Sequence, residues 1–103
     1  MNLASIFDRL NDLHFDGFLE RPVLKWNSRL RTSSGRFLPG QRSRHVPATI
    51  EVASYLLEEP ECETHVRETI AHEMIHYWLW VRRRPYGHTE EFYEKMQLMG
   101  ARR

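Results

Sequence analysis

The sequence has very little cysteine: Cys62 is the only one among 103 residues. A single thiol excludes an internal disulfide framework and any structural zinc site that needs two thiolates from one chain. Long apolar runs are also missing, because no stretch approaches the ~20 apolar residues that a membrane-spanning helix needs. Residues 1–15 lack the basic start and unbroken apolar run of a signal peptide. We therefore expect a soluble, cytoplasmic protein with no membrane partner.

Glycine and proline are not enriched, with five of each, and no repeat, low-complexity run or linker interrupts the chain. A hydrophobic content of 41 % and a charged content of 28 % are typical of a globular protein. At this length about two-thirds of the unfolded surface can be buried. We expect one domain, residues 1–103, and a monomer.

Charge is distributed unevenly, although the net charge is only +1. Residues 21–50 contain seven basic side chains and no acidic one, whereas residues 51–79 contain seven acidic side chains and one basic. A basic segment can follow a phosphate backbone or bind an acidic protein. Alternatively, arginines on exposed strands keep a small sheet soluble. The candidate nucleic-acid-binding residues in this segment are Lys25, Arg29, Arg31, Arg36, Arg42 and Arg44.

Apolar spacing in the first half predicts one helix followed by strands. Residues 3–13 have helical spacing, and Asp16-Gly17 is a suitable stop. Residues 23–26 and 30–32 are predicted to be short strands with a turn between them, followed by a connection or second hairpin arm around Arg36-Phe37. Residues 49–54 alternate apolar and polar side chains, which predicts a half-buried strand.

The second half is predicted to be helical. Residues 61–83 form a long helix that is apolar almost all round in its second part, as expected of a buried central helix. Residues 89–99 form a short helix after Pro85 and Gly87. The fold class is therefore α+β, with an N-terminal helix, a small, mostly antiparallel sheet, a long central helix and a short C-terminal helix.

The central helix contains the motif His72-Glu73-Met74-Ile75-His76. Residues four apart lie on one helix face about 5.4 Å from each other, so two imidazoles can bind one metal ion. Glu73 lies beside them, where a carboxylate can act as general base on water. The alternative is that these are ordinary polar residues of a half-buried helix. Burying them unpaired costs on the order of 1–3 kcal/mol per group, which favours a metal site.

A catalytic zinc needs three protein ligands and an open fourth position. The metzincin pattern is excluded, because Leu79 and Arg82 stand where it requires Gly and His. His88 is the favoured third ligand, since a turn before it can fold back on the central helix. The alternatives are carboxylates of the last helix: Glu91, then Glu90 or Glu94. We predict one Zn²⁺ ion as cofactor, with Glu73 as the catalytic residue.

Several segments resemble the SprT-like (Spartan-related) zinc metallopeptidase family. They are the metal motif at 72–76, Tyr86-Gly87-His88-Thr89-Glu90-Glu91-Phe92 with Met96, and four earlier segments: 10–17, 24–30, 35–37 and 50–54. The resemblance implies a zincin-like fold, His72, His76 and His88 as ligands, and cleavage of DNA-associated or DNA-crosslinked proteins. Members of the family often continue into a cysteine-rich zinc ribbon, which the single Cys62 cannot form.

We therefore expect a zinc-dependent endopeptidase acting on protein or peptide substrates. Residues 49–54 are expected to form the cleft rim and pair with extended substrate. Candidates for oxyanion stabilisation are Tyr86, Tyr93 and His45. His14 and His45 could both be site residues, but we expect His14 to be a helix-end residue and His45 a loop residue. Trp78 and Trp80 are expected in the core. The alternatives are a nucleic-acid-binding module with structural zinc, and a latent peptidase that needs activation by a partner.

Overall fold

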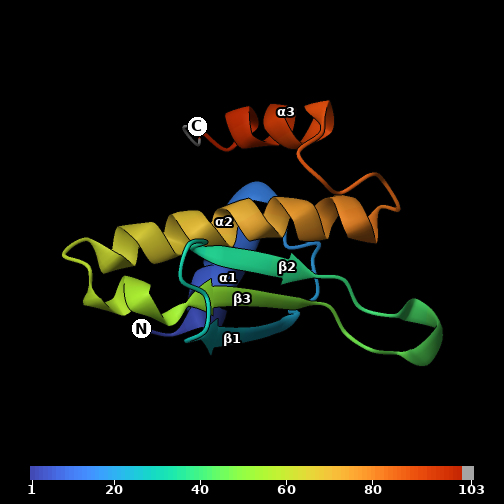
Figure 1. Cartoon of the computed structure of the whole chain (residues 1–103). Helices are drawn as coiled ribbons and strands as arrows, with labels where there is room; N and C mark the ends of the chain where they lie inside the picture. Colours follow the sequence, from blue (N-terminus) through green and yellow to red (C-terminus); the bar gives the residue numbers. More distant parts are fainter. Residues whose placement is uncertain (101–103) are drawn as a thin grey trace.

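Three α-helices and a three-stranded sheet make up residues 1–100, the part of the chain that this computed structural model describes (Figure 1). Residues 101–103 lie outside it. The elements in chain order are α1 (Leu3–His14), β1 (Val23–Asn27), β2 (Gly35–Leu38), the 3-10 turn η1 (Arg42–Arg44), β3 (Thr49–Ala53), the 3-10 turn η2 (Ser54–Glu58), α2 (Cys62–Val81) and α3 (Glu90–Leu98). The predicted α+β class is confirmed, and each predicted helix agrees with the structure to within about two residues at either end.

The sheet is mixed rather than mostly antiparallel. Its order is β1-β3-β2, with β3 parallel to β1 and antiparallel to β2. The strand predicted at residues 30–32 is wrong: this segment belongs to the connection that carries the chain from β1 across to β2. The arm predicted around Arg36-Phe37 is β2 itself. A short alternating run predicts a strand but does not identify its partner, and β1 pairs with the distant β3 instead of the next segment.

Strand β3 is almost completely buried, so the prediction of a half-buried strand is wrong. Glu51 at its centre is only 3 % exposed. Its carboxylate accepts hydrogen bonds from Arg36 Nε at 2.5 Å and Asn27 Nδ2 at 2.9 Å, and Lys25 Nζ lies 3.6 Å away. Burial acts to raise the pKa of Glu51, but these hydrogen bonds and positive charges outweigh it and lower the pKa. Glu51, the polar residue in the middle of the alternating pattern, is therefore buried and forms ion pairs with Arg36 and Lys25.

Helix α2 lies along the sheet, and α1 and α3 pack against it (Figure 1). Fully buried side chains from α1, the sheet, α2 and α3 form one core, including Phe7, Ile50, Ile70, Met74 and Phe92. Trp78 and Trp80 are partly buried against this core, as predicted. The Arg82 guanidinium lies over the Trp78 ring, and that of Arg42 lies over the Trp80 ring. Within residues 1–100 no helix has the length and apolar character to cross a bilayer.

Local capping explains where the outer helices begin. The Asn2 side chain accepts a hydrogen bond from the Ser5 amide at the start of α1. Thr89 does the same for the Phe92 amide at the start of α3. After α1, the Asn11 side chain bonds both the amide and the carbonyl of Leu19 and so fixes the following loop.

Gly35 marks the closest approach of the sheet to α2. A Cβ atom there would lie 2.6 Å from Thr69 Cγ2 and 2.7 Å from the Glu51 carbonyl oxygen. We expect Gly35→Ala to destabilise the domain by about 1–3 kcal/mol, as overpacking does. The melting temperature should fall by roughly 4–8 °C per kcal/mol in thermal denaturation. Gly87→Ala is the matched control, since nothing lies within 4 Å of its added Cβ. Equal melting temperatures for the two variants would contradict this packing.

Candidate metal centre

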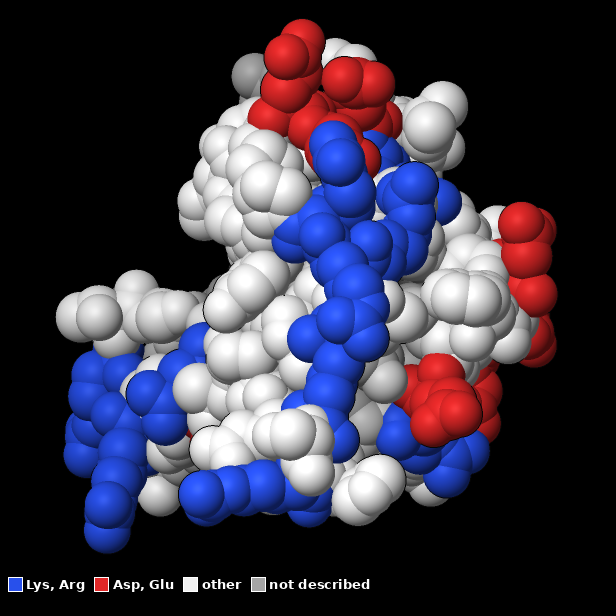
Figure 2. All heavy atoms as spheres, turned by 90° about the vertical axis from the view of Figure 1, so that its right-hand side faces the viewer, with Lys and Arg blue, Asp and Glu red and all other residues white. Residues whose placement is uncertain are grey.

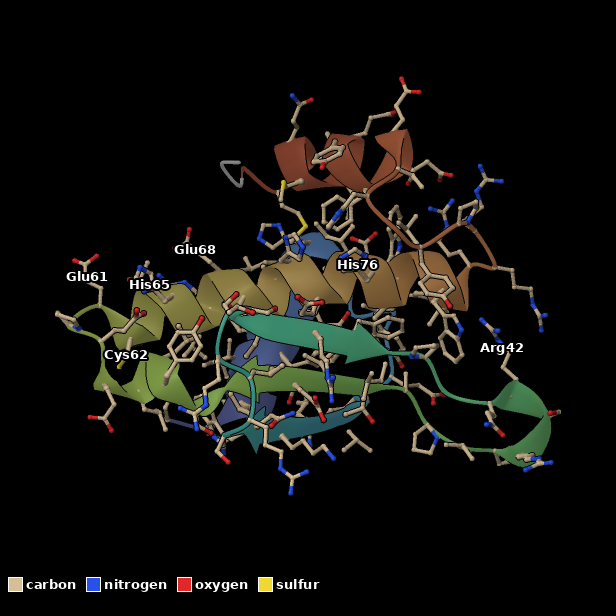
Figure 3. The ribbon with its side chains drawn as sticks, in the orientation of Figure 1. Arg42, Glu61, Cys62, His65, Glu68 and His76 are labelled. Carbon is tan, nitrogen blue, oxygen red and sulfur yellow. The ribbon has the colours of Figure 1, made fainter. Side chains whose placement is uncertain are left out.

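Three histidines meet between α2 and the segment that leads into α3. His72 and His76 project from the same face of α2, and Figure 3 shows His76 on the side of the helix toward α3. His88 approaches from the loop after α2. Their ligand atoms all lie within 4.8 Å of one another, and this is the only such group within residues 1–100. The structure therefore brings together the three histidines that the sequence singled out.

The distance between the His72 and His88 rings fits two ligands of a tetrahedral ion. His72 Nε2 lies 3.4 Å from His88 Nε2. Two nitrogens bound to zinc at ~2.0–2.1 Å with tetrahedral angles stand about 3.3–3.4 Å apart. Two imidazole nitrogens at this distance repel through their lone pairs unless they share a proton or a cation. Three imidazoles are a donor set that can hold a divalent metal ion such as zinc.

The backbone fixes the orientation of His76. Its Nδ1 lies 2.6 Å from the carbonyl oxygen of Tyr86. Because a carbonyl only accepts, Nδ1 carries the proton and Nε2 keeps its lone pair. Metal-binding histidines commonly donate their second N–H in this way. No sequence pattern indicates this contact, because it involves a main-chain atom that the loop brings close to His76.

Burial favours the neutral form of His72 and His76 and makes Glu73 more basic. It lowers the pKa of His72 to about 4, with smaller contributions from His76 and His88. It also lowers the pKa of His76. Glu73 is 6 % exposed, and burial raises its pKa to about 7. Neutral imidazoles bind metal ions, and a carboxylate with a pKa near neutrality suits proton transfer.

Phe92 forms an apolar wall behind the three rings. It is fully buried, and its ring centroid lies 4.8 Å from that of His72, 4.6 Å from His76 and 4.9 Å from His88. No spacing within the last helix indicates that one ring would contact all three histidines, because this contact depends on how α3 packs on α2.

An ion pair closes the loop that presents His88. Glu91, the alternative third ligand, bonds Arg84 at 2.7 Å (Oε1 to Nε) and has its other oxygen 4.0 Å from Arg82. It is therefore engaged with arginines at the start of the loop that follows α2. Glu90 and Glu94 are exposed side chains of α3 and are not part of the histidine group. His88 is the third member of the group.

A cleft of about 590 Å³ opens beside His72 and Glu73. It is lined by residues of α1 (Leu10, His14), the first residue of β2 and the two before it (Ser33, Ser34, Gly35), α2 (Arg67, Glu68, Thr69, Ala71, His72, Glu73, Ile75), and α3 with the two residues after it (Met96, Met99, Gly100). The strand at this cleft is β2. The expectation that residues 49–54 pair with substrate is wrong, because β3 is paired on both sides and has no free edge.

The other candidate residues lie at varying distances from the histidines. Tyr93 is close, with its ring centroid 6.2 Å from that of His88. The Tyr86 ring packs edge-on against Phe37 at 5.9 Å. His45 lies just after η1 in the exposed segment between β2 and β3. His14 is the last residue of α1, as expected, and also lines the cleft.

The six candidate nucleic-acid-binding residues fall into two groups. Lys25, Arg29 and Arg36 line a hollow around Glu51, and Arg31 is exposed in the connection that follows β1. Arg42 and Arg44 belong to η1, where the Arg42 guanidinium lies 3.9 Å from the Trp80 ring centroid and donates to the Trp80 carbonyl. Figure 2 shows basic side chains in a band down the face at the C-terminal end of α2.

Comparison with known proteins gives the same family as the motifs. The SprT-like family model matches residues 3–103. The chain is 33 % identical over 76 residues to a protein from Streptococcus suis strain 05ZYH33 described as "Protein SprT-like", an alignment covering 74 % of this chain and 48 % of that relative. It is 31 % identical over 106 aligned positions to a protein of the same description from Oceanobacillus iheyensis, covering 100 % of this chain and 64 % of the relative. The chain thus spans about half to two-thirds of these relatives, and it belongs to the SprT-like family.

Proposed function

We propose that this domain is a zinc-dependent metalloendopeptidase with a zincin-like active site. The observation that supports it best is the histidine group, whose His72 and His88 nitrogens stand at the separation of two tetrahedral zinc ligands, with the buried Glu73 on the same helix. The proposed ligands of one Zn²⁺ ion are His72, His76 and His88. When bound, the ion supplies Lewis acidity toward a peptide carbonyl and toward the attacking water.

Glu73 performs the proton transfers in this proposal. It accepts a proton from the attacking water and delivers it to the nitrogen of the departing amine, so the carboxylate is regenerated after each cycle. Its buried position and raised pKa suit both steps. Tyr86 holds the His76 ring through its carbonyl, and Phe92 excludes water from behind the histidines.

Strand β2 is the proposed substrate-pairing edge. The Ser34 carbonyl accepts the Ala53 amide at 2.8 Å, so Ser34 faces β3. Along a strand of an antiparallel pair, the N–H and C=O groups of alternate residues point toward the partner strand and away from it. The main-chain groups of Gly35 and Phe37 therefore point away from β3 and are on the free edge of β2. Consistent with this, the Gly35 carbonyl accepts the Ser33 hydroxyl at 2.7 Å. An extended peptide added along β2 would lie beside Glu73, as in β-strand addition.

DNA contact is a second part of the proposal. The basic band at the end of α2 and the basic hollow on the sheet offer positive charge on two faces of the domain. Binding there would bring the peptidase to DNA-associated or DNA-crosslinked proteins in the cytoplasm. Two alternatives use the same basic surfaces. In one, the domain is a nucleic-acid-binding module and its zinc is structural. In the other, it is a peptidase that is latent until DNA or a partner binds.

Removal and return of the metal test the proposal. We expect the zinc-loaded domain to cleave an unfolded protein such as casein, to lose this activity with 1,10-phenanthroline, and to regain it when zinc is added. The readout is product analysis by mass spectrometry, with and without single-stranded DNA. Cleavage that persists after complete metal removal contradicts zinc catalysis. Cleavage only with DNA identifies the latent form, and DNA binding without any cleavage favours the nucleic-acid-binding module.

A further inference from the structure

The cleft beside the histidines crosses over α2 and does not simply follow β2. Successive helical residues are rotated by about 100°, so residues two apart lie on nearly opposite flanks. Thr69 and Glu73 are on the flank toward β2, where Gly35 lies close to both. Ala71 and Ile75 are on the other flank. His72 is between the two flanks, so the cleft passes over the proposed metal ligand.

The far end of the cleft is apolar and is built from three helices. Ala71 and Ile75 come from α2, Leu10 from α1 and Met96 from α3, and Met99 directly follows α3. Leu10, Ile75 and Met96 are buried, so they form a fixed floor. The end of the cleft toward β2 is instead lined by Ser33, Ser34 and Gly35, small residues that leave room for a peptide backbone. One cavity therefore combines a place for extended main chain with a place for an apolar side chain.

The side chains around the cleft have little net charge, which favours an uncharged side chain as its ligand. Arg67 and Glu68 are exposed residues of opposite sign, so they leave little net charge along the cleft. Burial, with a smaller effect of the Lys95 charge, lowers the pKa of His14, which keeps this side chain neutral at neutral pH. Lys95 itself is turned away to the main chain, because its ammonium donates to the His14 carbonyl at 2.6 Å and lies over the Phe15 ring.

We propose that this apolar end, formed by Leu10, Ala71, Ile75, Met96 and Met99, is a specificity pocket for an apolar side chain of the peptide substrate next to the scissile bond. This inference rests on the proposed function, because the pocket is defined relative to Glu73 and His72. A peptide lying along β2 would direct one side chain across α2, past His72, into the pocket. The domain therefore prefers sites with a large apolar residue at one fixed position relative to the bond that is cut.

Two substitutions with opposite effects test the pocket. Ala71→Leu narrows it and keeps a good helix former, whereas Met99→Ala enlarges it. The assay is digestion of a mixed peptide library by each zinc-loaded variant, with the residues flanking every cut identified by mass spectrometry. Leu98→Ala is the matched control for Met99→Ala, since Leu98 is the neighbouring residue of α3, is 83 % exposed and does not line the cleft.

We expect wild type and Leu98→Ala to favour large apolar residues at one position. Ala71→Leu should lower kcat/KM for these sites about 10–200-fold relative to sites with small residues, the range that differences of about one methylene produce in an apolar pocket. Met99→Ala should shift the preference to larger side chains. A wild-type profile without apolar preference, or profiles unchanged in both variants, overturns the pocket while leaving metal-dependent hydrolysis intact. Absence of zinc-dependent cleavage by wild type overturns the proposed function and the pocket together.

Discussion

Replacing Glu73 with glutamine is expected to abolish peptide hydrolysis while leaving zinc binding intact. The amide has nearly the same shape as the carboxylate, but it cannot accept the proton of the attacking water. General acid–base groups contribute about 10²–10⁴-fold to rates, so kcat/KM should fall by that factor. The measurement is the rate of cleavage of one defined peptide, together with zinc content by elemental analysis and the melting temperature of each sample.

The separate measurements distinguish loss of chemistry from loss of structure. Glu73 is on α2 between two proposed ligands, and no ligand atom is removed by the substitution. Full zinc content and an unchanged melting temperature in an inactive variant support the assigned role. Equal cleavage by wild type and Glu73→Gln shows that Glu73 is not the general base, whatever the metal content.

Removing His88 is expected to have the largest effect on the metal itself. His88 is the only proposed ligand outside α2, and its nitrogen stands 3.4 Å from that of His72. Outer-sphere partners of metal ligands already change affinity about 10–100-fold, so loss of a direct ligand in His88→Ala should cost more than about 100-fold. Competition with a chromogenic chelator measures this affinity without reference to activity.

Glu91→Gln is the matched control, because Glu91 was the alternative ligand on the same segment. Its carboxylate is bonded to Arg84, so the substitution weakens the loop closure and removes no member of the histidine group. We expect a zinc affinity within about tenfold of wild type, much closer than that of His88→Ala. If Glu91→Gln loses zinc and His88→Ala keeps it, the carboxylate is the third ligand and the site consists of two histidines and one glutamate.

Local patterns in the sequence predicted what local interactions control. The spacing of Leu3 to Leu13 defined α1, because a helix buries one face with a period of 3.6 residues. The same period placed His72 and His76 on one face of α2 with Glu73 between them. The turn before His88 and the family resemblance of the segment around it predict His88 as the third ligand, and the structure brings it close to the other two histidines.

Tertiary structure decided everything that depends on which distant segments meet. Strand pairing is non-local, so no pattern indicated that β3 would be central, that β2 would be the free edge, or that Glu51 would be buried against Arg36 and Lys25. The sequence by itself determined the helices and the residue types that can hold a metal. Only the folded chain joined the Tyr86 carbonyl, the Phe92 ring and the cleft across α2 to them, because such contacts depend on packing between elements and not on spacing within one.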